Sequence, residues 1–269
     1  MTERDTIAID DEDFVPSLIF SCGQCFRFNE VSPGVWQGVA FGKTLRISGT
    51  AIERPKEEYE GLWRNFLDMD TDYAAIRKAV SVNPFMEAAA EYGKGIRILR
   101  QDFWEALCSF IISQQNNIPR IKKIIRDLCG GDDRPFPDAR DVAAMSEADL
   151  RELGMGYRAP YILGAAARCA SGSLRADCSR EDLLKLHGVG EKVANCVMLY
   201  GQRRGGAFPV DVWMNRALSR YFPPGFDHRD AFGEYAGVAQ QYIYHYIRHL
   251  DDKSKALNRT RITNSKDKK

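Results

Sequence analysis

Apolar and polar residues alternate along residues 14–53, with the period of a β-strand that buries one face. The alternating positions are Phe26, Arg27 and Phe28 and, further along the chain, Leu45, Arg46 and Ile47. Turn-forming sequences interrupt the pattern at Ser32-Pro33-Gly34 and at Gly42-Lys43. We therefore predict an antiparallel meander in this part of the chain.

Beyond residue 70 the apolar positions follow helical spacing instead. Asp70-Thr71-Asp72 is a typical start for a helix over Tyr73–Val80, and Ser146 with Asp149 forms a capping-box-like start for a short helix. Further helices are predicted around a buried stripe of Leu107, Phe110 and Ile111, and over Val212–Tyr221 and about Arg229–Leu250. The fold class is therefore α+β, with the strands first and the helices after them.

The formal net charge of +1 hides a division of charge along the chain. Residues 1–92 contain 9 Lys/Arg and 16 Asp/Glu, a balance of −7, whereas residues 93–269 contain 29 and 21, a balance of +8. A basic second part is the electrostatic pattern of a protein that binds a polyanion. We predict a sheet domain over residues 1–92, a helical domain over 93–252, and a basic flexible tail over 253–269.

Composition excludes several other classes of protein. A chain of 269 residues with 44% hydrophobic content can bury one large core or two smaller ones. It has no apolar run of membrane-spanning length, and its first 13 residues are acidic, unlike a signal peptide. Seven scattered cysteines, an odd number, are typical of reduced thiols. We expect a soluble intracellular monomer without a membrane partner, located in the cytoplasm with the nucleoid if the source is bacterial.

One C-x-x-C sequence, Cys22 to Cys25, raises the alternative of a redox pair or half of a zinc site. A complete zinc site would need a second such pair or a nearby pair of histidines. The chain has no second C-x-x-C, and its four histidines all lie at position 187 or beyond. We therefore predict no metal and no cofactor.

The stretch Leu183–Asp211 contains the densest set of candidate functional residues. Apolar residues with helical spacing lie on both sides of Gly188-Val189-Gly190, which predicts two short helices joined by a tight hairpin. Such a turn at a helix N-terminus directs backbone N–H groups outward, where they can bind a phosphate. Lys192 follows the hairpin, and Asp211 precedes the next helix. A lysine early in a helix is usually only a solvated charge, and Asp211 could simply cap a helix.

The pattern L-x-G-V-G-x-K-V-A-x-C, followed by Pro209-Val210-Asp211, resembles the helix-hairpin-helix DNA glycosylases, most closely their 8-oxoguanine branch. This resemblance implies an N-terminal twisted antiparallel sheet with helices, followed by an all-α bundle that carries the hairpin. It also implies a substrate of double-stranded DNA containing 8-oxoguanine. Gly188, Val189 and Gly190 would then contact the DNA backbone.

The same resemblance assigns a base pocket. Gly23, in a G-Q-x-F-R segment, would accept a hydrogen bond from the N7–H that 8-oxoguanine has and guanine lacks. One unpaired buried acceptor costs roughly 1–3 kcal/mol, enough for about 10–100-fold discrimination. Gln240 would contact the pairing edge of the base. Tyr244, where the family has phenylalanine, would stack on one face, and Cys196 would cover the other.

The resemblance also implies which residues would contact the DNA strand opposite the lesion. Gln115, Asn116 and Asn117 occupy the place of a run of three family asparagines, the first of which contacts the orphaned cytosine. Gln115 departs from that run by one methylene. Arg120 and Arg158 match arginines that read the same cytosine, and Tyr157 matches a residue that wedges into the stack. The alternatives are a plain polar loop for residues 115–117 and core packing for Tyr157.

The chemistry implied is attack by Lys192 on C1′ of the extruded nucleotide, once desolvation or positive neighbours make its amine neutral. A Schiff base and β-elimination would follow, with Asp211 stabilising the cationic sugar and orienting the amine.

Three alternatives to this function remain. Iron–sulfur relatives carry four cysteines after the hairpin region, and this chain has none beyond Cys196. Alkyl-base glycosylases lack the lysine, and a non-catalytic hairpin module would need neither Lys192 nor the base pocket.

Overall fold

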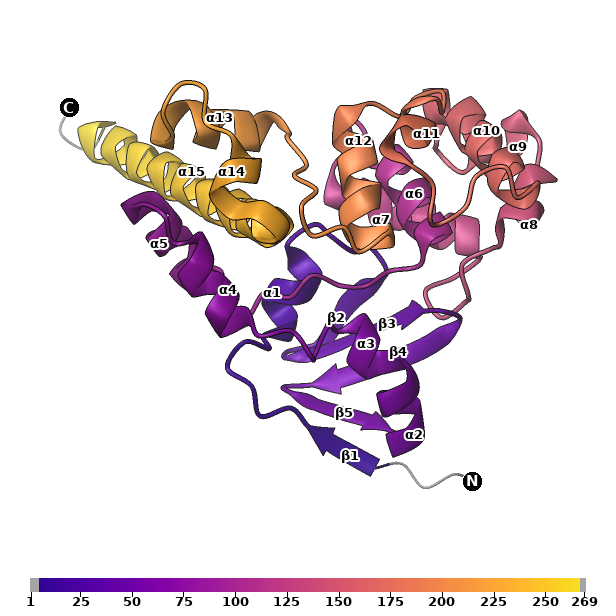
Figure 1. Cartoon of the computed structure of the whole chain (residues 1–269), viewed down its shortest axis with the longest axis horizontal. Helices are drawn as coiled ribbons and strands as arrows, with labels where there is room; N and C mark the ends of the chain where they lie inside the picture. Colours follow the sequence, from indigo (N-terminus) through magenta and orange to yellow (C-terminus); the bar gives the residue numbers. More distant parts are fainter. Residues whose placement is uncertain (1–4, 267–269) are drawn as a thin grey trace.

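The computed structural model of the chain describes residues 5–266 and places a five-stranded sheet beneath two groups of helices (Figure 1). The strands are β1 (Asp5–Ala8), β2 (Phe28–Ser32), β3 (Val35–Ala40), β4 (Lys43–Ser48) and β5 (Ala51–Arg54). The helices up to the middle of the chain are α1 (Pro16–Ser21), α2 (Lys56–Glu58), η1 (Tyr59–Trp63), α3 (Arg64–Phe66), α4 (Tyr73–Val80), α5 (Pro84–Tyr92), α6 (Phe103–Ile112) and α7 (Ile118–Cys129). The later helices are α8 (Ala139–Ala143), α9 (Glu147–Glu152), η2 (Gly156–Arg158), α10 (Ala159–Ala170), α11 (Arg180–Leu184), α12 (Glu191–Cys196), η3 (Val197–Gly201), α13 (Val212–Tyr221), α14 (His228–Phe232), η4 (Gly233–Tyr235) and α15 (Ala236–Lys266).

The sheet is antiparallel throughout, with the strand order β1-β5-β4-β3-β2, which confirms the predicted meander from β2 to β5. Along β4 the buried Leu45 and Ile47 alternate with the exposed Arg46, because successive side chains of a strand point to opposite faces. The sequence pattern predicted no strand before Phe14. Instead, β1 pairs with β5 and forms an edge of the sheet.

Aromatic residues fill the core between the sheet and its own helices. Phe20 of α1 stacks on Phe28 of β2 with ring centroids 4.3 Å apart, and Phe66 of α3 lies 5.7 Å from Phe28 on another side. Trp63 packs edge-on against Phe66 at 5.8 Å and is fully buried. Aromatic pairs in this geometry add stability beyond the area that they bury. The loop that follows α1, residues 22–27, is thereby fixed at one end to a rigid core.

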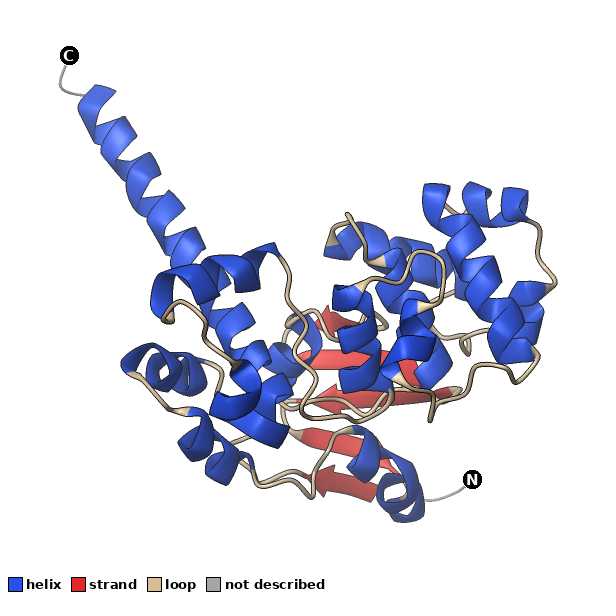
Figure 2. Ribbon diagram, turned by 45° about the horizontal axis from the view of Figure 1, so that its top comes forward, coloured by secondary structure: helices blue, strands red, loops and turns tan. Residues whose placement is uncertain are grey.

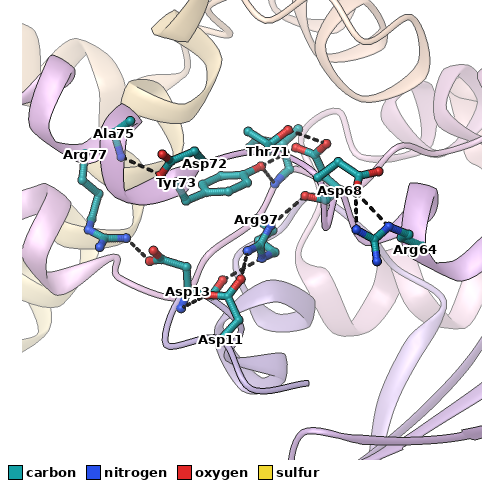
Figure 3. A network of polar contacts seen from close by, with 12 residues as sticks. Asp11, Asp13, Arg64, Asp68, Thr71, Asp72, Tyr73, Ala75, Arg77 and Arg97 are labelled. Carbon is teal, nitrogen blue, oxygen red and sulfur yellow. Dashed lines mark hydrogen bonds and ion pairs between the residues drawn. The ribbon is translucent and has the colours of Figure 1, made fainter. Parts of the chain in front are cut away.

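A buried arginine ties the N-terminal segment to the chain that leads into the helical part (Figure 3). The Arg97 guanidinium donates to the backbone oxygens of Asp13 (2.8 Å) and Asp68 (2.6 Å) and also pairs with the carboxylate of Asp11. Tyr73 lies beneath it, with the guanidinium carbon 4.7 Å from the ring centroid. A buried charge needs several partners of this kind. The extended segment around Arg97 is consequently held in one position.

The helical part has a single core around α6, whose ten residues are all buried. The sequence predicted only a stripe of Leu107, Phe110 and Ile111, but neighbouring elements surround this helix, so its polar Glu105 and Ser109 are buried as well. The buried faces of α4 and α5 belong to this core and not to the core of the sheet. The two cores therefore do not divide at residue 92.

The predicted helix bounds agree with the structure where local signals are strong. The helix α4 begins after Asp72, whose side chain accepts from the Ala75 N–H, and α13 has the predicted bounds. The predicted capping box is present at the start of α9, where the Ser146 and Asp149 side chains each bind the other residue's backbone N–H. Capping residues act through their own neighbours in sequence, and for this reason these ends could be predicted.

The C-terminal helices differ from the prediction at both ends. The expected helix Arg229–Leu250 is broken at Gly233, whose φ of +53° is left-handed, so α14 and η4 precede α15. The flexible tail was predicted from residue 253. Instead, α15 continues to Lys266 and extends away from the body of the molecule (Figure 2), while residues 267–269 lie outside the described residues. No glycine or proline follows Gly237 to end the helix.

Candidate active site

The predicted hairpin is present between α11 and α12, and its first glycine is required for two physical reasons. Gly188 has a left-handed φ of +80°, and a Cβ there would lie 2.1 Å from the ring of Tyr161. Gly190 is the N-cap of α12. Leu183, before the turn, and Val189, within it, are both buried. The hairpin is thus packed tightly onto α10, which carries Tyr161.

Lys192 and Asp211, 19 positions apart in sequence, line the same cavity of about 50 Å³. All four residues predicted for the base pocket line it too. The full lining is Cys22, Gly23, Phe110, Lys192, Cys196, Tyr200, Pro209, Asp211, Gln240, Gln241 and Tyr244. The elements that meet here are the loop after α1, α6, α12 with η3, the segment before α13, and α15. Sequence reasoning missed Phe110 and Gln241, since neither carries a local signal of a site.

The Lys192 amine lies beside an aromatic ring in the cavity. Its Nζ is 5.3 Å from the centroid of the Phe110 ring. Along α12, Lys192 lies one turn before Cys196. Burial raises the pKa of the Cys196 thiol, and the Lys192 charge opposes that rise. The amine of a lysine that lines such a cavity can serve as a nucleophile toward a bound sugar.

Asp211 caps α13 from the rim of the cavity. Its Oδ1 accepts hydrogen bonds from the backbone N–H groups of Trp213 and Met214, both at 2.9 Å. Both bonds fall on Oδ1, so capping occupies one of the two carboxylate oxygens. The capping role that the sequence raised as an alternative is therefore present, and it is compatible with a carboxylate that faces the cavity.

Two of the residues that the resemblance assigns to base recognition, Gly23 and Gln240, line the cavity. Gly23 has a φ of +85°, and Tyr244 lies so close that a Cβ on Gly23 would be 3.7 Å from its ring. The Oε1 atom of Gln240 is buried, and no described residue donates a hydrogen bond to it. Such an orphan acceptor is costly unless a ligand pairs with it. The Tyr244 hydroxyl accepts from Arg248 at 3.3 Å.

A wider groove of about 640 Å³ shares Gly23, Phe110, Lys192, Asp211 and Tyr244 with the cavity and extends it outward. Its outer lining includes Gln115 and Asn116 from the loop between α6 and α7, hereafter the probing loop, which carries the predicted DNA contacts at 115–117. Gln115 has a left-handed φ of +47°, which is uncommon for a residue with a side chain. Asn117 lies outside this lining and caps α7, where its side chain accepts from the Arg120 N–H at 3.0 Å. The loop therefore faces the same groove as the candidate catalytic pair.

The three remaining predicted DNA contacts divide between surface and interior. Tyr157 is 43% exposed and Arg120 is exposed, as a contact with DNA requires. Arg158, however, is only 5% exposed, and its guanidinium donates to the backbone oxygens of Gln114 and Gln115 and to that of Met155. In this conformation the Arg158 side chain supports the backbone of the loop and is almost entirely buried.

The seven cysteines are all free thiols, and burial raises the pKa of Cys22 to about 11 and of Cys25 to about 12. Within residues 5–266 no three His, Cys, Asp or Glu side chains are grouped closely enough to hold a metal ion. In the same part of the chain no helix is both long and apolar enough to cross a membrane.

Comparison with known proteins finds two family matches that together span most of the chain. Residues 6–107 match the 8-oxoguanine DNA glycosylase N-terminal domain, and residues 108–230 match the HhH-GPD superfamily of base excision DNA repair proteins. A crystal structure of Clostridium acetobutylicum 8-oxoguanine glycosylase/lyase, in complex with duplex DNA containing cytosine opposite 8-oxoG, has a TM-score of 0.86 and 33% identity. That match covers 93% of this chain and 97% of the other.

Two curated proteins match over shorter lengths. The N-glycosylase/DNA lyase of Saccharomyces cerevisiae is 37% identical over 157 residues, which cover 47% of this chain and 42% of that protein. The N-glycosylase/DNA lyase OGG1 of Arabidopsis thaliana is 31% identical over 199 residues, 60% of this chain and 54% of that protein. The chain thus spans about half the length of these curated relatives.

Proposed function

The chain belongs to the 8-oxoguanine DNA glycosylase branch of the HhH-GPD superfamily, and from this premise we propose that it excises 8-oxoguanine from duplex DNA and then cleaves the strand. The observation that carries the proposal is the shared cavity of Lys192, Asp211, Gly23 and Gln240. A primary amine, a carboxylate, a glycine and a side-chain amide meet there although the sequence separates them widely.

Recognition of the base would use the polar groups of the cavity. A glycosylase must extrude its target nucleotide, because C1′ is shielded within the base stack. The carbonyl oxygen of Gly23 would accept from the N7–H that distinguishes 8-oxoguanine from guanine. The orphan Oε1 of Gln240 would accept from a donor on the pairing edge of the base. Tyr244 and Cys196 would cover the two faces.

The chemistry would begin with the lone pair of the Lys192 Nζ. The amine bonds to C1′, the glycosidic bond breaks, and its electron pair leaves with N9 of the base, which takes up a proton. Opening of the sugar ring gives a Schiff base between Nζ and C1′. Loss of a proton from C2′ then expels the 3′ phosphate by β-elimination. The Asp211 carboxylate would stabilise positive charge on the sugar, an electrostatic effect that is strong in a site with little water.

We also propose that cytosine is the preferred base opposite the lesion. Arg120 is exposed beside the groove, and a guanidinium can donate to the O2 and N3 acceptors of an unpaired cytosine. Gln115 lies at the position of the contact asparagine, where its longer side chain would place the amide less accurately. On the same premise, we infer that the protein acts as a monomer where chromosomal DNA lies, in the cytoplasm with the nucleoid if the source is bacterial.

A nicking assay tests the proposed function. The protein is incubated with an end-labelled duplex that carries one 8-oxoguanine opposite cytosine, and the products are resolved with and without hot alkali. We expect cleavage at the lesion without alkali, and no cleavage of the matched guanine duplex. Alkali-dependent cleavage alone would show excision without lyase activity. Binding without either product would support a non-catalytic hairpin protein instead.

A further inference from the structure

Three buried glutamines surround the backbone on both sides of Gly23. Gln24, Gln101 and Gln241 are 0%, 9% and 2% exposed, although an uncharged amide side chain is usually found at the surface. They come from the loop after α1, from the segment that precedes α6, and from α15. Segments far apart in sequence therefore converge on the backbone that flanks Gly23, whose carbonyl group the proposed function assigns to base recognition.

On the C-terminal side of Gly23, the Gln24 side chain anchors the loop to the extended segment around Arg97. Its Nε2 donates to the Arg97 carbonyl oxygen at 2.7 Å, and its Oε1 accepts from the Leu99 N–H at 2.8 Å. The backbone oxygen of Gln24 accepts in turn from Nε2 of Gln101 at 2.7 Å. Gln24, the residue that follows Gly23, is thus held through both its side chain and its backbone carbonyl group.

On the N-terminal side, Gln241 holds the preceding peptide. Its Nε2 donates to the Cys22 carbonyl oxygen at 2.8 Å, and its Oε1 accepts from the Tyr200 hydroxyl at 2.7 Å. Gln241 is adjacent in sequence to Gln240, whose orphan Oε1 lies buried in the same cavity. The first turns of α15 therefore carry one amide that faces the base and another that fixes the backbone beside Gly23.

We propose that Gln101 and Gln241, together with Gln24, are positioning residues that fix the direction of the Gly23 carbonyl for lesion recognition. This inference rests on the proposed function. Carbonyl groups on both sides of Gly23 are held by amide donors, so the peptide between them has little freedom to rotate. An acceptor must lie within about 2.7–3.2 Å of its donor, and misplacement by about 1 Å can cost ~100-fold in rate. An amide suits this task because it can donate to one buried group and accept from another.

The proposal separates two reactions of the same site. Excision of 8-oxoguanine needs the base in the pocket, and so needs the Gly23 carbonyl in place. Cleavage of a preformed abasic site needs Lys192 and bound DNA, but no base. A loosened Gly23 should therefore impair the first reaction and spare the second, whereas general damage to the fold would impair both.

Gln101→Met and Gln241→Met test this, because each removes an amide that donates to a carbonyl beside Gly23 while keeping the side-chain length; Gln241→Met also removes the acceptor of the Tyr200 hydroxyl. Gln202→Met is the matched control, since Gln202 donates to the Cys178 carbonyl at 3.0 Å and lines neither the cavity nor the groove. Single-turnover rates are measured on 8-oxoguanine and on abasic duplexes. Each rate is normalised to the amount of enzyme that borohydride traps on abasic DNA, which corrects for any misfolded fraction.

We expect both test variants to excise 8-oxoguanine about tenfold more slowly or worse, with abasic cleavage within about twofold of wild type. The control should retain both rates. Unchanged excision in either test variant, or an equal fall in both reactions, would overturn the proposal. If wild type itself fails to excise 8-oxoguanine, the proposed function is wrong, and this outcome differs from each of the others.

Discussion

The side-chain amide of Gln114 donates a hydrogen bond to the Gly188 carbonyl oxygen at 2.9 Å, and so connects the probing loop to the hairpin. The backbone oxygen of Gln114 accepts from Arg158 as well. One residue thus joins three segments that the sequence assigned to DNA contact: the loop, the hairpin and the Tyr157-Arg158 pair.

Gln114→Ala should therefore weaken DNA binding without a direct effect on the chemistry. The variant loses the bond to the hairpin, so ordering of the loop must occur when DNA binds. We expect a roughly three- to tenfold higher Kd for a duplex with an uncleavable abasic analogue, corresponding to the ~1 kcal/mol of one hydrogen bond. The single-turnover rate at saturating enzyme should stay within about twofold. A Gln37→Ala control on β3 should bind normally, and an unchanged Kd for Gln114→Ala would refute the link.

Gln115→Asn should improve both stability and the selection of the opposite base. Gln115 has a φ of +47°, a conformation in which asparagine is several-fold enriched over other residues with side chains. The shorter amide also has one rotatable bond fewer. We expect a small rise in Tm and an approximately fivefold wider preference for cytosine, for a gain of ~1 kcal/mol. Single-turnover rates with C, A, G and T opposite the lesion measure the preference. An equal preference for cytosine in wild type and in Gln115→Asn would mean that the arginines alone select the opposite base.

Much of the fold could be predicted because its signals are local. The capping residues Asp72 and Ser146 define their helix ends through neighbours in sequence. What was missed depends on distant partners. The strand β1 forms only because β5, more than 40 residues later, offers it a free edge. The burial of Arg158 depends in the same way on the carbonyl groups of Gln114 and Gln115.

The candidate site likewise combines residues that local sequence signals predict with residues that depend on distant partners. The hairpin pattern and the family resemblance predicted six of the residues that line the cavity. Phe110 and Gln241 were not predicted. Phe110 has the spacing of an ordinary core residue, and only the tertiary fold places its ring beside the Lys192 amine. Gln241 resembles any polar residue of an amphipathic helix until its partner, the carbonyl group of Cys22, is known.

Asp211→Asn separates helix capping from catalysis. Asparagine caps helices about as well as aspartate, so the hydrogen bonds to Trp213 and Met214 should persist, with Tm within a few degrees of wild type. Loss of the negative charge should slow excision by about 100-fold or more, the typical cost of removing one electrostatic group from an active site. Thermal melting and single-turnover excision measure the two effects. A collapse in Tm with an unchanged rate per folded molecule would make the aspartate purely structural.

Glu105 predicts a pH dependence of stability. Burial raises the pKa of this carboxyl from 4.5 to about 7, and Arg27, 3.9 Å away, opposes the rise only in part. The folded protein therefore binds one more proton than the unfolded chain between these two values. Its free energy of unfolding should fall by up to about 3 kcal/mol as the pH rises across this window.

Glu105→Gln removes the titrating group and should remove its contribution to the fall of the free energy of unfolding with rising pH. We expect the Tm of the variant to decline less than that of wild type between pH 5 and pH 8. Glu53→Gln, at an exposed position on β5, serves as the control and should follow wild type. Parallel Tm curves for Glu105→Gln and wild type would show that this carboxyl does not govern the pH dependence.

The central claim is that the Lys192 amine forms the covalent bond to the sugar. Lys192→Gln should abolish excision and strand cleavage and yet bind lesion DNA with nearly the wild-type Kd, because affinity for DNA comes mainly from contacts with its backbone. Normal excision by this variant would remove Lys192 from the mechanism.

Borohydride trapping followed by peptide mapping tests this claim most directly. Borohydride reduces a Schiff base to a stable amine, so wild type mixed with the 8-oxoguanine duplex should yield a covalent protein–DNA adduct. After digestion, mass spectrometry should find the sugar remnant on the peptide that contains Lys192, and Lys192→Gln should yield no adduct. An adduct on another residue, or undiminished trapping in the variant, would contradict the account.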